Sequence, residues 1–284
     1  MSDDVEASLD QLYTEVWNEY LEFNQPTEIF HYTSAEGLCG ILTRKLFFAS
    51  DLFCLQDPLE FQYGKSVLMG VLQTRSDAVS QSLWADLSEH PLFPHKGKNW
   101  SVYSVSFCGT KDLLGQWRGY GGAAGYAVGV RLTAVLKHPQ RFTVLRMLYN
   151  PEKQQQVFGR LMSGAAEIFE RYHKTRCDNE LLTQIGSRLV QSIFNLKHPA
   201  FHGEDEWRIL MLEPYNSVEF PVQYRVSGGR IVPYIELRFE PDWISRVVLG
   251  PTAVRYPNEG TIMRMLATGG FEGAVCESSA IPLL

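Results

Sequence analysis

The chain of 284 residues is 45% hydrophobic, 12% aromatic and 20% charged, a composition typical of globular proteins with a sizeable core. Its formal net charge of −6 argues against a broad basic surface of the kind that binds nucleic acid without sequence preference. We therefore expect no extended surface for duplex DNA, although a small basic pocket for a phosphorylated ligand is compatible with this charge.

Cysteine spacing and the lack of targeting signals predict a cytoplasmic protein. The cysteines are Cys39, Cys54, Cys108, Cys177 and Cys276. Their number is odd and no two have metal-ligand spacing, so scattered reduced thiols are expected in place of a disulfide framework or a zinc ribbon. The acidic N-terminus MSDDVEASLD does not resemble a signal peptide, and no apolar run reaches transmembrane length. We expect no membrane partner.

The first half of the chain predicts helices and strands in alternation. Apolar residues at three- and four-residue steps predict a helix over 4–23. An alternating segment predicts a strand over 28–32, and Thr33 with Glu36 has capping-box spacing for the helix that follows. The other elements expected here are a strand over 46–50, a mainly helical region over 58–88, a loop over 90–98, a strand over 100–108, a glycine-rich turn over 119–125 and a strand over 126–132.

The second half predicts a long helical region followed by most of the strands. The helical region covers 151–196, and a last helix covers 258–268. Strands are expected over 206–212, 218–224, 231–239 and 244–249. Together these elements predict the α+β class. We expect a single domain over 1–284, with an N-terminal helix at about 4–23 and a helical insertion at about 151–196.

The first candidate site is the run His31-Tyr32-Thr33, which leads into a predicted helix. Free N–H groups and the helix dipole favour an anion at such a position, and His31 is able to donate to a ribose hydroxyl or a phosphate. The alternative is purely structural: Thr33 caps the helix, Tyr32 packs as a hydrophobic staple and His31 is a satisfied strand residue.

The second candidate is the segment GQWRGYGG, residues 115–122. Its glycines permit close backbone approach, and Arg118 offers a planar fork for phosphate or carboxylate. Trp117 and Tyr120 are able to stack on a base or a nicotinamide ring. The alternative is a turn with aromatic anchors and a structural pair between arginine and a carboxylate.

The third candidate is the segment HGEDEWR, residues 202–208. In a strand, Glu204 and Glu206 share a face, and paired carboxylates suit reactions at a glycosidic carbon. The alternative is a solvated acidic turn before an edge strand. The histidines show no metal-binding spacing, so no metal is expected. Cys108 has no assignable catalytic partner and is expected to be a buried, inert thiol.

Several segments together resemble a bacterial family named only as domain of unknown function 2971. They are HYTSAEGLCGIL, LFFASDLFCLQDPLEF, SVSFCGTKDLLGQWRGYGG, FHGEDEWRIL, ISRVVLGPT and CESSAIPL, and the resemblance extends over about residues 28–284. The Trp-Arg-x-Tyr and Glu-Trp-Arg elements are its most specific parts.

That family is in turn similar to the ADP-ribosyltransferase superfamily of the His-Tyr/Ser-Glu type. The similarity implies a split, strongly bent, mixed or antiparallel sheet with flanking helices. It also implies NAD as the substrate, cleaved at the bond between nicotinamide and ribose. The superfamily places a histidine on the first core strand, a serine or tyrosine on the second and a glutamate on a later strand; His31, Ser106 and Glu206 follow this order.

The resemblance also implies a role for each candidate residue. Glu206 would stabilise the positively charged ribose, while Glu204 would orient the acceptor or take its proton, although which acid is catalytic stays open. His31 would hold the ribose on the adenosine side. Arg118 or the helix entry would bind the pyrophosphate. Tyr32, Trp117 or Tyr120 would stack on the nicotinamide.

The chain departs from the family pattern at two positions. Ser106-Phe107-Cys108 replaces Cys-Phe-Ser, which moves the hydroxyl by two positions along the same strand face. Gln56 replaces the Asn of an Asp-Pro turn. The resemblance implies an NAD-consuming ADP-ribosyltransferase, and this is the function we expect. Its acceptor is a protein, a nucleic acid or a small molecule, and the resemblance is compatible with a toxin or a defence effector. The alternatives are an NAD glycohydrolase, a catalytically inactive nucleotide-binding module and a structural interaction protein.

Overall fold

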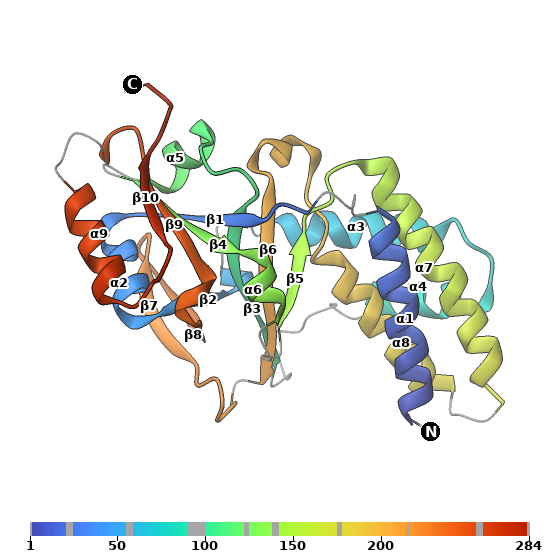
Figure 1. Ribbon diagram of the computed structural model, residues 1–284. Coiled ribbons are helices and arrows are strands. Elements are labelled where there is room, and N and C mark those ends of the chain that lie inside the picture. Colours follow the sequence, from blue (N-terminus) through green and yellow to red (C-terminus); the bar gives the residue numbers. More distant parts are fainter. Residues whose placement is uncertain are drawn as a thin grey trace. The chain divides into compact units, whose positions relative to one another are not determined.

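Figure 1 shows the fold as a computed structural model, which describes residues 2–20, 25–54, 59–89, 100–121, 125–137, 142–174, 178–214, 216–253 and 258–282. The chain divides into two compact units. The helical unit consists of residues 1–24, 57–98 and 146–202, and the sheet unit consists of residues 25–56, 99–145 and 203–284. The expected N-terminal helix and helical insertion therefore share one unit, to which a third segment also contributes.

The helical unit packs its helices around an apolar core. Its helices are α1 (Ser2–Tyr20), α3 (Leu59–Gln73), α4 (Ala78–Glu89), α7 (Pro151–Tyr172) and α8 (Asp178–Ile193). Buried Val16, Leu68 and Phe158 belong to the same core cluster. Asn150 caps α7 by accepting a hydrogen bond from the Lys153 N–H at 2.9 Å. The helices predicted over 4–23 and 151–196 are thus confirmed within the described residues.

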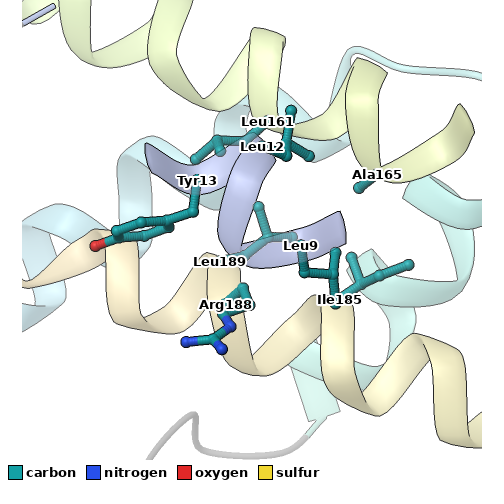
Figure 2. Close-up of a pocket in the computed structure, with 8 residues that line it drawn as sticks. All are labelled: Leu9, Leu12, Tyr13, Leu161, Ala165, Ile185, Arg188 and Leu189. Carbon is teal, nitrogen blue, oxygen red and sulfur yellow. The ribbon is translucent and has the colours of Figure 1, made fainter. Parts of the chain in front are cut away.

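A small apolar cavity lies inside the helical unit, between α1, α7 and α8 (Figure 2). Leu9, Leu161 and Leu189 are among its lining residues. Its volume of about 10 Å³ is at the lower limit for a single water molecule, and its walls are largely apolar. The cavity is therefore a packing defect between helices and offers no room for a substrate.

The described residues of the sheet unit form a ten-stranded mixed sheet with flanking helices. The strands are β1 (Glu28–Thr33), β2 (Leu46–Asp51), β3 (Trp100–Cys108), β4 (Tyr126–Arg131), β5 (Thr143–Arg146), β6 (Glu206–Pro214), β7 (Gln223–Ser227), β8 (Arg230–Arg238), β9 (Ile244–Leu249) and β10 (Val275–Ser278). The helices are α2 (Ala35–Arg44), α5 (Leu114–Tyr120), α6 (Leu132–Lys137) and α9 (Glu259–Thr268). The α+β class is confirmed.

The sheet divides at strand β3. The strand order is β10-β9-β4-β1-β3-β2-β8-β7, and β6 pairs with β3 while β5 pairs with β6. One edge of β3 pairs with β6 along its whole length. The other edge is shared, because Cys108 pairs with Phe30 of β1 whereas Ser104 pairs with Ser50 of β2. Strands β1 and β2 therefore diverge from the same edge, and we call the gap between them, beside residues 105–107 of β3, the split.

The two faces of β3 differ in polarity because its sequence alternates. Tyr103, Val105 and Phe107 lie in the main hydrophobic core, on what we call the core face. Ser104, Ser106 and Cys108 point to the opposite face. Cys108 there packs with Tyr32 and Trp117 of α5 in a smaller cluster, so we call this side the α5 face.

Three local predictions need correction. The N-cap of α2 is Ser34, whose hydroxyl accepts from the Gly37 N–H at 3.2 Å, because Thr33 pairs with Tyr126 and so remains in β1. Residues 114–120 form helix α5, where a turn was expected from residue 119. The strand predicted over 218–224 begins only at Gln223.

The physical reason for the third correction lies in the segment just before β7. Val218 is 96% exposed, and the Phe220 N–H donates to the Ser217 hydroxyl at 3.1 Å, which closes a turn. Pro221 lacks an N–H for a ladder. The loop predicted over 90–98 and the Gln56 departure lie outside the described residues. No described helix is both long and apolar enough to cross a bilayer.

Candidate functional site

Glu206 opens strand β6 and is held by Arg208 two residues later. The Arg208 Nε donates to Glu206 Oε1 at 2.7 Å, and Nη2 donates to Oε2 at 2.9 Å. Because they are two apart in a strand, both side chains lie on one face, and both are buried. The pair holds the Glu206 carboxyl group in a fixed orientation, with a guanidinium directly beside it.

Glu204 does not share that strand face, contrary to the expectation for a Glu-x-Glu strand. It closes the short 3-10 helix η2 (Pro199–Glu204), and its side chain is partly exposed. Asp205 has a φ of 44° and turns the chain sharply before β6 begins. The Glu204 carbonyl accepts from Gln116 of α5 at 3.4 Å, which fixes this turn against the helix.

Gly109, which follows β3, lies in close contact with Asp205. Its N–H donates to the Asp205 carbonyl at 2.8 Å. A Cβ at this position would lie 2.5 Å from Asp205 Oδ2, so any side chain here would displace the Asp205 carboxylate. Thr110 donates its hydroxyl to the same carboxylate oxygen at 3.0 Å. The acidic segment is therefore ordered by β3 and does not form a solvated turn.

Cys108 ends β3 and pairs with Glu206 at the start of β6. The pKa of its buried thiol is raised to about 12, mainly by burial, with a smaller contribution from the negative charges of Asp205, Glu206 and Glu204. The Thr110 N–H donates to the sulfur at 3.3 Å. The expected inert thiol is consistent with this environment. Ser106, two residues earlier on the same face, is exposed.

His31 occupies the split between β1 and β2. Its Nδ1 donates to the Ser106 carbonyl at 2.9 Å, so that in the neutral ring Nε2 is the acceptor nitrogen. Phe47 and Phe107 pack against the ring, with centroid distances of 5.3 and 5.7 Å. Burial is the largest influence on His31 and lowers its pKa, and the charge of Arg225 acts in the same direction.

His31 and Glu206 project from opposite faces of the sheet. Glu206 pairs with Cys108, and Cys108 pairs with Phe30, so these three side chains lie on the α5 face. His31 follows Phe30 and points to the core face, where Phe107 contacts it. The structure thus joins His31 to Ser106 through a backbone carbonyl, but it does not bring His31 and Glu206 to one face.

Tyr32 and Trp117 serve as anchors of the α5 face. The Tyr32 hydroxyl donates to the Thr110 carbonyl at 2.8 Å and accepts from the Leu113 N–H at 3.0 Å. Its ring packs edge-on against Trp117, with centroids 4.6 Å apart. Trp117 is 6% exposed and donates its Nε1–H to Asp112 at 2.7 Å. Neither ring is open for stacking on a nicotinamide in this arrangement.

Arg118 and Tyr120 lie on the exposed side of α5. Tyr120 is 53% exposed. No carboxylate pairs with Arg118 among the residues described, so the structural arginine–carboxylate pair considered from the sequence is not formed there. Thr33 is half-buried at the end of β1, close to Gly37. Because they lie on the exposed side of α5, Arg118 and Tyr120 are accessible to a ligand from solvent.

Two important groups in the sheet unit carry no motif that the sequence pattern singles out. Asp112 accepts from Trp117, from the Ser279 hydroxyl at 2.6 Å and from the Ala280 N–H at 2.7 Å. Arg225 donates to the Ser50 hydroxyl at 2.9 Å. Both depend on pairings between distant strands or segments, so a local pattern contains no signal for them. Over the described part of the chain, no group of three or more His, Cys, Asp or Glu residues is arranged to hold a metal.

A family model described as "Protein of unknown function (DUF2971)" matches residues 116–209. The matched span contains Trp117, Arg118, Glu204 and Glu206, and it supports the family resemblance that the motifs predict. The match covers less than half of the chain and carries no statement of activity. No curated protein matches the chain.

Proposed function

We propose that the protein is an ADP-ribosyltransferase-like enzyme that cleaves NAD between nicotinamide and ribose and transfers ADP-ribose to an acceptor. The observation that carries the proposal is the divergence of β1 and β2 from one edge of β3, with His31 in the split. Three acids, residues 204–206, stand at the end of the same strand. A split sheet with this order of a histidine, a serine and an acid is what the superfamily resemblance implies.

The reaction requires a carboxylate near the ribose. As the bond between C1 of the ribose and the nicotinamide nitrogen breaks, its electron pair leaves with the nitrogen and positive charge develops on the ribose. A nearby carboxylate stabilises this charge. An acceptor oxygen or nitrogen then bonds to C1 and gives its proton to a carboxylate.

The geometry favours Glu204 over Glu206 for the acid that faces the ribose. Arg208 donates to both oxygens of Glu206, and its positive charge offsets the field of this carboxylate. Glu204 is partly exposed at the end of η2, whereas Glu206 is buried, so Glu204 is the acid that is open to a ligand from solvent. We therefore assign the ribose-facing role to Glu204 and a positioning role to Glu206, which fixes the start of β6.

A second candidate function is that of a nucleotide-binding module without catalysis. The specific observation in its favour is that Glu206 is bound to Arg208 and lies on the face opposite to His31. Such a module binds NAD through the split and does not turn it over. This candidate predicts that neither Glu204 nor Glu206 affects any chemical step.

The test is nicotinamide release from NAD by the purified wild-type chain, Glu204→Gln and Glu206→Gln, with Glu240→Gln as the exposed control. We expect release by the wild type and the control, and a loss of about 100-fold in Glu204→Gln. A loss confined to Glu206→Gln reverses the assignment of the two acids. Free ADP-ribose without labelled macromolecule identifies water as the acceptor.

A calorimetric NAD titration of the same samples separates the remaining outcomes. Binding without release, unchanged in both acid variants, establishes the non-catalytic module. Absence of both binding and release overturns the proposed function.

A further inference from the structure

Arg225 is a partly buried cation without an acidic partner among the described residues. It lies on β7, and its side chain is partly exposed. Its Nη2 donates to the Ser50 hydroxyl at 2.9 Å, while its Nε is buried and has no hydrogen-bond partner. Burial removes water from the Nε–H of Arg225, and no described carboxylate replaces that water. An anion that binds beside the guanidinium is therefore favourable.

Ser104 provides a second unpaired donor next to this arginine. It is 3% exposed, and its buried Oγ has no hydrogen-bond partner among the residues that the structure describes. Ser104 of β3 pairs directly with Ser50 of β2, so the two side chains leave the sheet on one face as close neighbours. Ser50 accepts from Arg225, which brings β2, β3 and β7 together at this point.

The register places all three residues on the face of the sheet that carries Ser106. Ser50 pairs with Tyr234 of β8, and Tyr234 pairs with Gln223, which shares a face with Arg225. The guanidinium is also close enough to the split for its charge to act on His31, whose lowered pKa has this charge as one of its causes. The unpaired donors therefore border the split.

We propose that Arg225, Ser50 and Ser104 form a subsite for a phosphate oxyanion. A phosphate oxygen accepts hydrogen bonds from Arg225 Nε and the Ser104 hydroxyl, which have no hydrogen-bond partner in the described part of the chain. The negative charge of the phosphate compensates the positive charge of the Arg225 guanidinium. That this phosphate belongs to NAD rests on the proposed function, whereas the capture of an oxyanion by these donors does not.

The experiment is isothermal titration of the full chain with inorganic pyrophosphate and, separately, with NAD. The variants are Arg225→Gln and Ser104→Ala, and the matched control is Arg230→Gln, an exposed arginine on the same hairpin. We expect the wild type and the control to bind pyrophosphate, and both other variants to bind it at least about tenfold more weakly. Ser104→Ala keeps the test valid if Arg225→Gln fails to fold, because removing an unpaired buried hydroxyl leaves no lost partner.

The two ligands distinguish failure of the subsite from failure of the proposed function. Pyrophosphate binding that depends on Arg225, without any NAD binding, supports the subsite and assigns it to a free phosphate compound. The subsite is overturned if the wild type does not bind pyrophosphate. It is also overturned if NAD binds equally well to the wild type, Arg225→Gln and Ser104→Ala.

Discussion

Arg208 and Glu206 form a bidentate ion pair on one face of β6, with donor–acceptor distances of 2.7 and 2.9 Å. The side chains are 3% and 7% exposed, so the pair lies almost wholly out of water. In a buried pair each charge depends on the other for compensation, and the loss of one partner is far more costly than the loss of both.

This dependence predicts a strong coupling in a double-mutant cycle. We expect Arg208→Met to lower the free energy of unfolding by about 3–5 kcal/mol, because Glu206 then loses both of these donors. Glu206→Gln with Arg208→Met should be destabilised by less than the sum of the single variants. Urea unfolding of the four proteins measures the coupling. Additive effects would show that the pair contributes nothing as a pair.

A second prediction concerns the thiol of Cys108. Because burial raises its pKa to about 12, the thiolate is scarce at about pH 8, and we expect almost no alkylation of this residue in the folded protein. Exposed Cys39 serves as the internal control. Mass spectrometry after iodoacetamide treatment compares the two peptides, and both should be modified in denaturant. Equal modification of both in the folded state would contradict the buried position of Cys108.

A third prediction concerns the titration of His31. Burial lowers its pKa below the ordinary value of 6.5, against the opposing effect of the hydrogen bond to Ser106. The unfolded state therefore binds the proton at a higher pH than the folded state. The stabilising effect is present above 6.5 and is lost as the pH falls through the lower folded value. An NMR titration of the ring should give a midpoint below 6.5.

The same linkage predicts how a variant behaves. His31→Asn should reduce the fall in unfolding free energy between about pH 7 and about pH 5. Urea unfolding at the two pH values measures this difference. A variant whose stability falls as steeply as that of the wild type would show that His31 does not contribute to the acid sensitivity.

A fourth prediction concerns Asp112, which joins α5 to the C-terminal segment. Burial raises its pKa, but hydrogen bonds from Ser279, Trp117 and backbone N–H groups outweigh this effect and lower it below the usual value. The resulting stability is present above the ordinary aspartate pKa of 3.8 and is lost as the pH falls through the folded value.

Asp112→Ala should therefore lower the free energy of unfolding by about 2–3 kcal/mol near neutral pH. The difference from the wild type should shrink in acid, where the carboxylate becomes protonated. Glu240→Gln, an exposed acid in the same unit, is the control and should have little effect. Urea unfolding over a pH series checks both expectations, and a pH-independent difference would mean that packing, not charge, is responsible.

A fifth prediction contrasts two glycines. A Cβ on Gly250 would lie 2.8 Å from the Gly125 carbonyl oxygen and 2.9 Å from the Trp117 ring, so Gly250→Ala should cost about 1–3 kcal/mol. Gly119 lies in α5, where a Cβ would meet no atom within 4 Å other than those of its chain neighbours and its own helix backbone. Gly119→Ala should stabilise by up to about 1 kcal/mol through helix propensity. Thermal melts of the two variants give opposite shifts if the packing of Trp117 is as described.

Much of the local structure follows from the sequence pattern. The alternation in residues 100–108 predicts β3, and periodic apolar residues predict α1 and α7, because burial on one face leaves a repeat of two or of three to four residues. The sequence pattern does not predict the short elements. Strand β5 has four residues and α5 has seven, too few to establish a period, and tertiary contacts stabilise them.

The sequence by itself determined the α+β class, most strands and the candidates His31, Glu204, Glu206 and Arg118. Only the tertiary structure decided which of these act together. Strand pairing places His31 and Glu206 on opposite faces of the sheet. The Glu206 carboxylate is also bound by Arg208. Arg225 and Ser104 become neighbours only because β2 pairs with both β3 and β8. Register is a property of pairs of strands, and no single segment contains it.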